Sequence, residues 1–118
     1  MNIEDIRLWC LAKKGVTEDF PFDETTLVFK VLGKIFLLTD LEGDLFINVK
    51  CDPDKAIELR EKYSCVSPGY HMNKRHWNTI SVDDSVSGKL IKEWIDHSYK
   101  ETVKGLTRKQ KEELGDGI

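Results

Sequence analysis

Hydrophobic residues recur at helical spacing at the start of the chain. Ile3, Ile6 and Cys10 fall three or four positions apart and predict the buried stripe of an amphipathic helix over residues 2–14. Asn2, at the start of this segment, is a good N-cap, and Gly15 follows at the position where helices commonly end. We therefore expect the chain to open with a helix.

A polar segment over residues 17–24 then interrupts the pattern. It holds four acidic side chains, and Pro21 is incompatible with a regular helix. We expect a solvated loop here, with Phe20 and Phe22 inserted at the edge of the core.

Three runs of β character follow, over residues 26–31, 34–40 and 44–50. Apolar side chains alternate with others along them, which is typical of strands with one buried face. Leu32 and Gly33 separate the first two runs, and two residues including a glycine form the connection of a tight hairpin. We expect an antiparallel meander with one apolar face.

Helical and β patterns share the second half of the chain. Asp52 as N-cap and Pro53 at the first helical position predict a helix start, and Arg60 is expected on the outer face of that helix. In chain order, the remaining segments are expected to form a turn (66–69), a polar loop (70–76), a strand (77–82), a long helix (87–106) and a short charged helix (107–114).

This order of elements predicts an α+β fold, in which helices cover an antiparallel β-sheet. The sequence reads as a helix, a β-meander, a second helix, a further strand and a long C-terminal helix. The length of 118 residues predicts a single domain over 1–118, with residues 107–118 as a short charged C-terminal helix and tail.

The charge of the chain limits the kinds of nucleic-acid contact that it can make. The formal net charge of −3 excludes a strongly basic, DNA-coating protein, so any contact with nucleic acid needs a local patch. Residues 1–48 hold five Lys/Arg against nine Asp/Glu, whereas residues 49–118 hold thirteen against twelve. The distribution allows an acidic end and a more basic end on one surface.

The apolar runs are too short for a membrane span, and the first residues are charged, unlike a signal peptide. Three cysteines, Cys10, Cys51 and Cys65, form no CxxC pair, which predicts buried reduced thiols. We expect a cytoplasmic protein without a membrane partner, and favour a monomer.

The segment from 69 to 79, GYHMNKRHWNT, concentrates the polar chemistry of the chain. Its cations can neutralise phosphates, its amide and imidazoles can donate hydrogen bonds, and its indole can stack on a base or anchor the loop. The alternative is a solvated loop tip beside a core tryptophan. The candidate nucleic-acid-binding residues are His71, Asn73, Lys74, Arg75, His76 and Trp77.

Metal and nucleophile chemistry are less well supported. His71 and His76 lie five residues apart, which suits neither one helix face nor one strand face, and the sequence offers no third ligand nearby. A pair of Cys65 with His71 stays open, because such pairs form in space, yet the sequence contains no GxSxG motif or P-loop. We expect no cofactor, no metal and no enzymatic activity.

Several strings resemble the MmcQ/YjbR family of small bacterial proteins, and the resemblance covers residues 3–106. These strings are GVTEDFPF (15–22), FKVLGKIF (29–36), INVKCDPDKAIELREKY (47–63), PGYHMNKRHWNT (68–79) and WIDHSY (94–99). The resemblance implies a frataxin-like two-layer α+β sandwich and DNA binding through a double-wing arrangement of sheet and loops. Residues 68–79 match the family's most distinctive stretch.

Three functions are therefore carried forward. The first is a non-enzymatic DNA-binding or DNA-associated module that uses the basic, aromatic segment. The second is a domain whose sheet face binds a protein or a small ligand, with Lys30, Asn48, Lys50 and Tyr70 at its rim. The third and weakest is metal handling in the manner of frataxins, through the acidic residues near the N-terminus.

Overall fold

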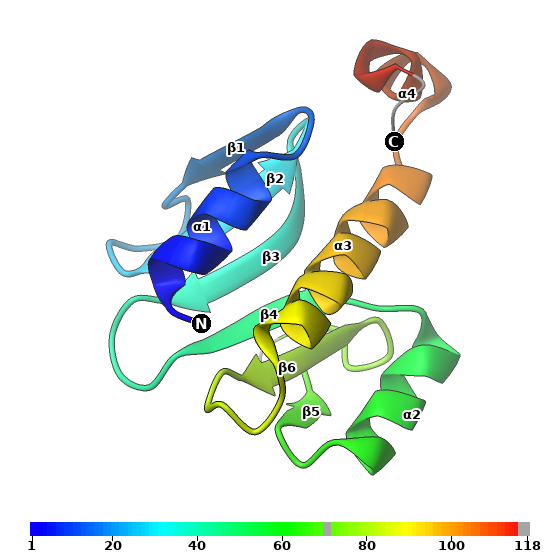
Figure 1. The fold of residues 1–118 in the computed structure, drawn as a ribbon. Helices are drawn as coiled ribbons and strands as arrows, with labels where there is room; N and C mark the ends of the chain where they lie inside the picture. The colour runs from blue at the N-terminus through cyan, green and yellow to red at the C-terminus, as the bar shows by residue number, and fades with distance from the viewer. Residues whose placement is uncertain (70–71, 116–118) are drawn as a thin grey trace.

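The computed structural model describes residues 1–69 and 72–115, which form helices and strands as Figure 1 shows. The helices are α1 (Ile3–Leu11), α2 (Pro53–Lys62), α3 (Gly88–Lys104) and α4 (Arg108–Leu114). The strands are β1 (Val16–Asp19), β2 (Thr26–Val31), β3 (Lys34–Asp40), β4 (Phe46–Lys50), β5 (Val66–Pro68) and β6 (Trp77–Ser81).

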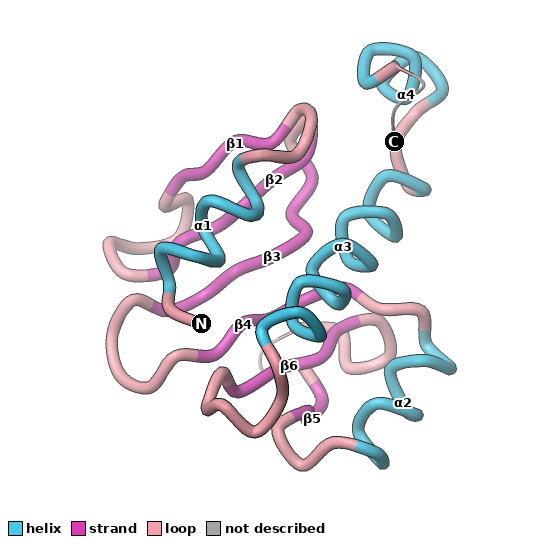
Figure 2. Tube along the Cα trace, viewed as in Figure 1, coloured by secondary structure: helices cyan, strands magenta, loops and turns pink. Residues whose placement is uncertain are grey.

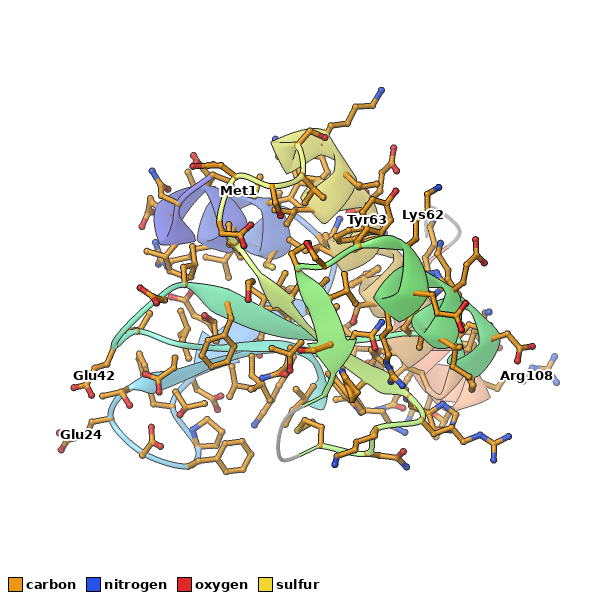
Figure 3. All side chains as sticks on the ribbon, turned by 90° about the horizontal axis from the view of Figure 1, so that it is seen from below. Met1, Glu24, Glu42, Lys62, Tyr63 and Arg108 are labelled. Carbon is orange, nitrogen blue, oxygen red and sulfur yellow. The ribbon has the colours of Figure 1, made fainter. Side chains whose placement is uncertain are left out.

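The strands form one antiparallel sheet in the order β1-β2-β3-β4-β6-β5. Figures 2 and 3 show the helices on one side of this sheet, so the molecule has two layers. Helix α3 packs on β2, β3 and β4, α2 packs on β5 and β6, and α1 packs on β1 and α3. The predicted α+β fold, an antiparallel sheet covered by helices, is confirmed.

The core lies between the two layers. Phe29, Leu37 and Ile47 from the sheet and Ile91 and Ile95 from α3 are buried almost completely. Removing a side chain of this size from water contributes about 1.5–3 kcal/mol to folding. The apolar face of α3 is therefore the face that covers the sheet.

A β-bulge in β3 fixes the sheet to α3. Phe29 pairs with Leu37 and the next residue pairs with Ile35, so Phe36 is the extra residue of the bulge. The ring of Phe36 meets the ring of Tyr99 edge-on at 5.5 Å, and its carbonyl oxygen accepts a hydrogen bond from the hydroxyl of Ser98. The bulge thus turns a backbone carbonyl and a large ring toward the same helix.

The segment over 17–24 departs from expectation. Its first residues belong to β1, in which Val16 pairs with Val31 and Asp19 with Val28, so the prediction of a loop was wrong there. An edge strand leaves many of its side chains in solvent, so an acidic sequence is compatible with it. Phe20 and Phe22 are 46% and 65% exposed and are not inserted into the core, contrary to expectation.

One helix boundary and one further segment also differ from the prediction. Helix α1 ends at Leu11, earlier than residue 14, although the N-cap at Asn2 is confirmed and forms a capping box with Asp5. The segment 66–69 was expected to form a turn, but residues 66–68 pair with β6 as the short edge strand β5.

The hairpin between β2 and β3 is confirmed. Leu32 and Gly33 both have positive φ, 45° and 85°, as a two-residue turn between twisted strands requires. Within residues 1–69 and 72–115, no helix is long and apolar enough to cross a membrane.

Candidate functional site

Within the described part of the polar segment, the chain turns and leads directly into β6, and we call residues 72–77, which end at the first residue of β6, the basic turn. The N–H of Arg75 donates to Oδ1 of Asn73 at 2.9 Å, and the N–H of His76 donates to the carbonyl oxygen of Asn73 at 3.2 Å. The carbonyl oxygen of His76 accepts from the N–H of Cys51 at 2.7 Å, which fastens the turn to the end of β4.

Arg60 of α2 holds the same turn from the helix layer. Its Nε donates to Oδ1 of Asn78 at 2.6 Å, and its guanidinium also donates to the carbonyl oxygens of Lys74 and Trp77. The sequence placed Arg60 on the outer face of its helix, and that prediction was wrong. The sequence did contain a signal for the inward position of this side chain, because Arg60 lies four residues after the buried Ala56 and shares its helix face.

The candidate residues divide by exposure. Asn73, Lys74 and Arg75 are exposed, His76 is half-buried, and His71 lies outside the described residues. The described part of the chain places no carboxylate in an ion pair with Lys74 or Arg75. The turn therefore presents two unneutralised cations to solvent.

Trp77 is buried, with 9% of its surface exposed. A buried indole cannot present a ring face to a base, so the stacking role considered for Trp77 is incorrect and the anchoring role applies. Its Cβ packs against Gly69, whose N–H donates to the carbonyl oxygen of Trp77 at 2.8 Å. Among the described residues, no group accepts a hydrogen bond from the indole N–H.

A cleft of about 440 Å³ opens between the basic turn, the start of α2 and the end of α3. Its lining residues are Lys50, Cys51, Asp52, Pro53, Asn73, His76, Trp77, Glu101 and Lys104. The two carboxylates are already engaged, since Asp52 caps α2 through the N–H of Lys55 at 3.2 Å and Glu101 pairs with Lys104 at 2.8 Å. Lys50 is in no ion pair with a described residue, so the cleft adds a cation to those of the turn.

Two cations outside the turn and the cleft are paired with carboxylates. Lys30 pairs with Asp19 at 3.3 Å, and Arg108 pairs with Glu112 at 3.7 Å. Figure 3 places Glu24 and Glu42 at one end of the molecule and Arg108 at the opposite end, as the charge distribution along the sequence allowed.

His97 supports the floor of the cleft. Its Nε2 accepts a hydrogen bond from the N–H of Asp52 at 3.2 Å, which requires a neutral ring. Burial lowers the pKa of His97, the positive charge of Lys55 lowers it further, and the carboxylate of Glu101 opposes both. The histidine thus fixes Asp52, the N-cap residue of α2.

Two of the three cysteines, Cys10 and Cys51, are not activated as nucleophiles. Burial raises the pKa of Cys51 to about 11 and that of Cys10 to about 12, so both thiols are protonated at neutral pH. Cys65 is buried, and its considered partner His71 lies outside the described residues. The described residues also contain no group of three or more His, Cys, Asp or Glu side chains arranged to hold a metal ion.

Comparisons with known proteins agree with the fold. The family model YjbR matches residues 11–101. The chain is 37% identical to the uncharacterized protein YbdF of Escherichia coli O157:H7, over 83% of this chain and 81% of that protein. It is 30% identical to the uncharacterized protein YjbR of Escherichia coli K12, over 97% of this chain and 98% of that one.

Two crystal structures are similar as well. The Deinococcus radiodurans protein DR2400, described as a DUF419 domain, superposes with a TM-score of 0.90 at 40% identity, over 97% of this chain and 88% of that chain. A Pseudomonas syringae protein superposes with a TM-score of 0.75 at 26% identity, over 86% of this chain and 99% of that chain.

Proposed function

Since the chain belongs to the YjbR family, we propose that it is a DNA-binding module that contacts the phosphate backbone through the basic turn. Lys74 and Arg75 supply the positive charge, and the amide of Asn73 and the ring of His76 supply hydrogen-bond donors. The role proposed is one of binding and not of catalysis, in the cytoplasm.

One observation carries this proposal, namely two exposed cations that have no carboxylate partner in residues 1–69 and 72–115 and lie on a turn of fixed backbone. Arg60, Asn73 and Cys51 already hold the turn in its conformation. A preorganised loop loses little conformational entropy when it binds, so more of the interaction free energy remains as affinity. The side chains of Lys74 and Arg75 still have to be ordered at the interface.

The adjoining cleft extends the surface available to a nucleic acid. Lys50 adds a third cation, and the indole N–H of Trp77 is a further donor among the residues that line it. Two or three neutralised phosphates give a slope of log affinity against log salt of about −2 to −3, at roughly −0.9 per phosphate. We therefore expect weak binding that depends on salt and not on base sequence.

Fluorescence anisotropy with labelled double- and single-stranded DNA tests the proposal. The variant Lys74→Ala/Arg75→Ala is compared with Lys89→Ala/Lys100→Ala, which removes the same charge from exposed positions of α3. We expect the first variant to lose about tenfold in affinity at low salt and the second to change by less than about twofold.

Equal losses in the two variants would show that only net charge matters, and would reject the basic turn as the interface. The absence of binding by the wild-type protein at low salt would reject DNA binding altogether. Circular dichroism of both variants checks that their folds are intact.

A further inference from the structure

A second cavity lies on the face of the sheet opposite the helices, and its features go beyond the proposed DNA contact. Its volume is about 440 Å³, within the range of about 300–1,000 Å³ typical of small-molecule sites. Leu38 and Asn48 form its floor as direct partners across β3 and β4, and Met72, at the start of the basic turn, lines one side.

The walls of this cavity are largely apolar. Phe22, Leu38, Phe46 and Met72 all line it. Phe22 is 65% exposed, so a large ring stands in water beside an apolar hollow. A ligand that covers this ring would remove apolar surface from water at about 25 cal/mol per Å².

The loop that presents Phe22 has a fixed base. Oδ1 of Asp23 accepts from the N–H groups of Thr25 and Thr26 at 2.9 and 2.6 Å, and Oδ2 accepts from the hydroxyl of Thr26 at 3.0 Å. These bonds lower the pKa of Asp23 and keep it ionised. Figure 3 shows this loop, with Glu24 labelled, on the side of the sheet away from the helices.

Two polar groups among the lining residues are not satisfied by the described part of the chain. Asn48 is only 3% exposed; its Oδ1 accepts from the hydroxyl of Thr79 at 2.5 Å, but no described group accepts from its Nδ2. Oδ1 of Asp40 accepts from the N–H of Glu42 at 2.9 Å, whereas Oδ2 receives no hydrogen bond or ion pair from a described residue. The cavity thus combines one donor, one anionic acceptor and an apolar wall.

We propose that this cavity binds a small aromatic molecule that carries an ammonium group at one end and an oxygen acceptor at the other. The ammonium pairs with Asp40, the oxygen accepts from Nδ2 of Asn48, and the ring packs against Phe22. Asp40 lies two residues beyond Leu38, the partner of Asn48, so about 7 Å along β3 separates Asp40 from the position opposite Asn48. A phenyl ring with an aminoethyl chain and a hydroxyl spans a similar length.

Tyramine is therefore a suitable probe, and NMR chemical-shift titration of the labelled full chain is a suitable measurement. We expect saturable shifts on the open face of β2, β3 and β4. 3-(4-Hydroxyphenyl)propionate has the same ring and hydroxyl but a carboxylate in place of the ammonium, and we expect it to bind about tenfold more weakly because it faces Asp40.

Two pairs of variants locate the site. Phe22→Ala is compared with Phe20→Ala, which removes another exposed ring from the same loop but not from the cavity lining. Asp40→Asn is compared with Asp44→Asn, which removes a charge from an exposed loop nearby. We expect the first member of each pair to weaken tyramine binding about five- to tenfold and the second to leave it within about twofold.

No saturable shift at about 10 mM tyramine would overturn the proposal. Equal binding of the carboxylate analogue, or equal effects within either pair of variants, would also overturn it. The DNA titration is independent of these outcomes, because it is read from the charges of Lys74 and Arg75, which do not line this cavity.

Discussion

Nε of Arg60 and Oδ1 of Asn78 are joined by a hydrogen bond of 2.6 Å, which links helix α2 to strand β6 across the end of the core. Asn78 is fully buried, and its Nδ2 donates to the carbonyl oxygen of Ala56 at 3.3 Å. The pair therefore satisfies a polar side chain inside the protein and, through the other donors of Arg60, orders the basic turn.

Replacement of Arg60 is expected to destabilise the protein through this buried amide. Arg60→Ala leaves Oδ1 of Asn78 without its donor, which lowers the free energy of unfolding by about 1–3 kcal/mol. Arg60→Lys keeps the charge but not the planar fork, so we expect it to recover only part of the loss. Urea unfolding measures the difference; a loss no larger than that of the exposed Arg108→Ala would contradict this role.

The close approach of two backbones makes Gly69 a sensitive position. A Cβ at Gly69 would lie 2.7 Å from Cβ of Trp77 and 2.9 Å from its carbonyl oxygen. We expect Gly69→Ala to lower the free energy of unfolding by about 1–3 kcal/mol, because backbone atoms cannot move aside cheaply.

Gly105 provides the matched control for this substitution. It has ordinary helical φ and ψ, and a Cβ there would meet its nearest atom at 3.5 Å. Gly105→Ala is therefore expected to be neutral or to stabilise the protein by about 0.4–1 kcal/mol. If thermal unfolding showed the two variants to be alike, the packing of Gly69 on Trp77 would not be as tight as described.

Acid is expected to weaken the fold through His97. Because its pKa is lower in the folded protein than in the unfolded chain, the unfolded state binds the proton more readily. The contribution of neutral His97 is complete above the unfolded pKa of about 6.5, and it is lost as the pH falls through that value toward the folded pKa.

His97→Gln isolates this effect, since glutamine offers an oxygen acceptor to the N–H of Asp52 but does not titrate. We expect the difference in unfolding free energy between wild type and variant to shift in favour of the variant between pH 7 and pH 5. Urea unfolding across this interval provides the measurement. A difference independent of pH would mean that the ring is not held neutral.

Alkylation tests the state of the thiols. With pKa values of about 12 and 11, Cys10 and Cys51 have almost no thiolate at pH 8, and Cys65 is buried. We expect iodoacetamide to modify the native protein slowly and to modify all three cysteines quickly in urea, as read by mass spectrometry. Rapid native labelling of Cys51 would show that the cleft gives access to a reactive thiol.

Much of the fold could be predicted from the sequence, because its strongest signals are local. The stripe of α3, the cap at Asn2 and the turn at Leu32 and Gly33 each depend on residues a few positions apart. Strand β1 was missed because pairing with β2 stabilises it, whereas its own side chains are mostly polar.

The site was less accessible to such reasoning. The sequence identified Lys74 and Arg75, which the structure leaves exposed, but it did not identify Arg60 as the residue that holds their turn. Helical periodicity places Arg60 on the face of Ala56, but it does not indicate that the side chain reaches a residue fourteen positions away. The burial of Trp77 likewise results from its pairing with Lys50 and the approach of Gly69, which the sequence does not show.

The two edges of the sheet have a consequence for the protein in concentrated solution. Edge strands β1 and β5 have four and three residues; β1 carries Glu18 and Asp19, and β5 ends at Pro68, which has no N–H to donate. Short, charged or proline-bearing edges discourage the addition of strands from another copy, the step that begins amyloid-like aggregation. The acidic side chains of β1, which led the sequence analysis to expect a loop, thus help to keep the molecules dispersed.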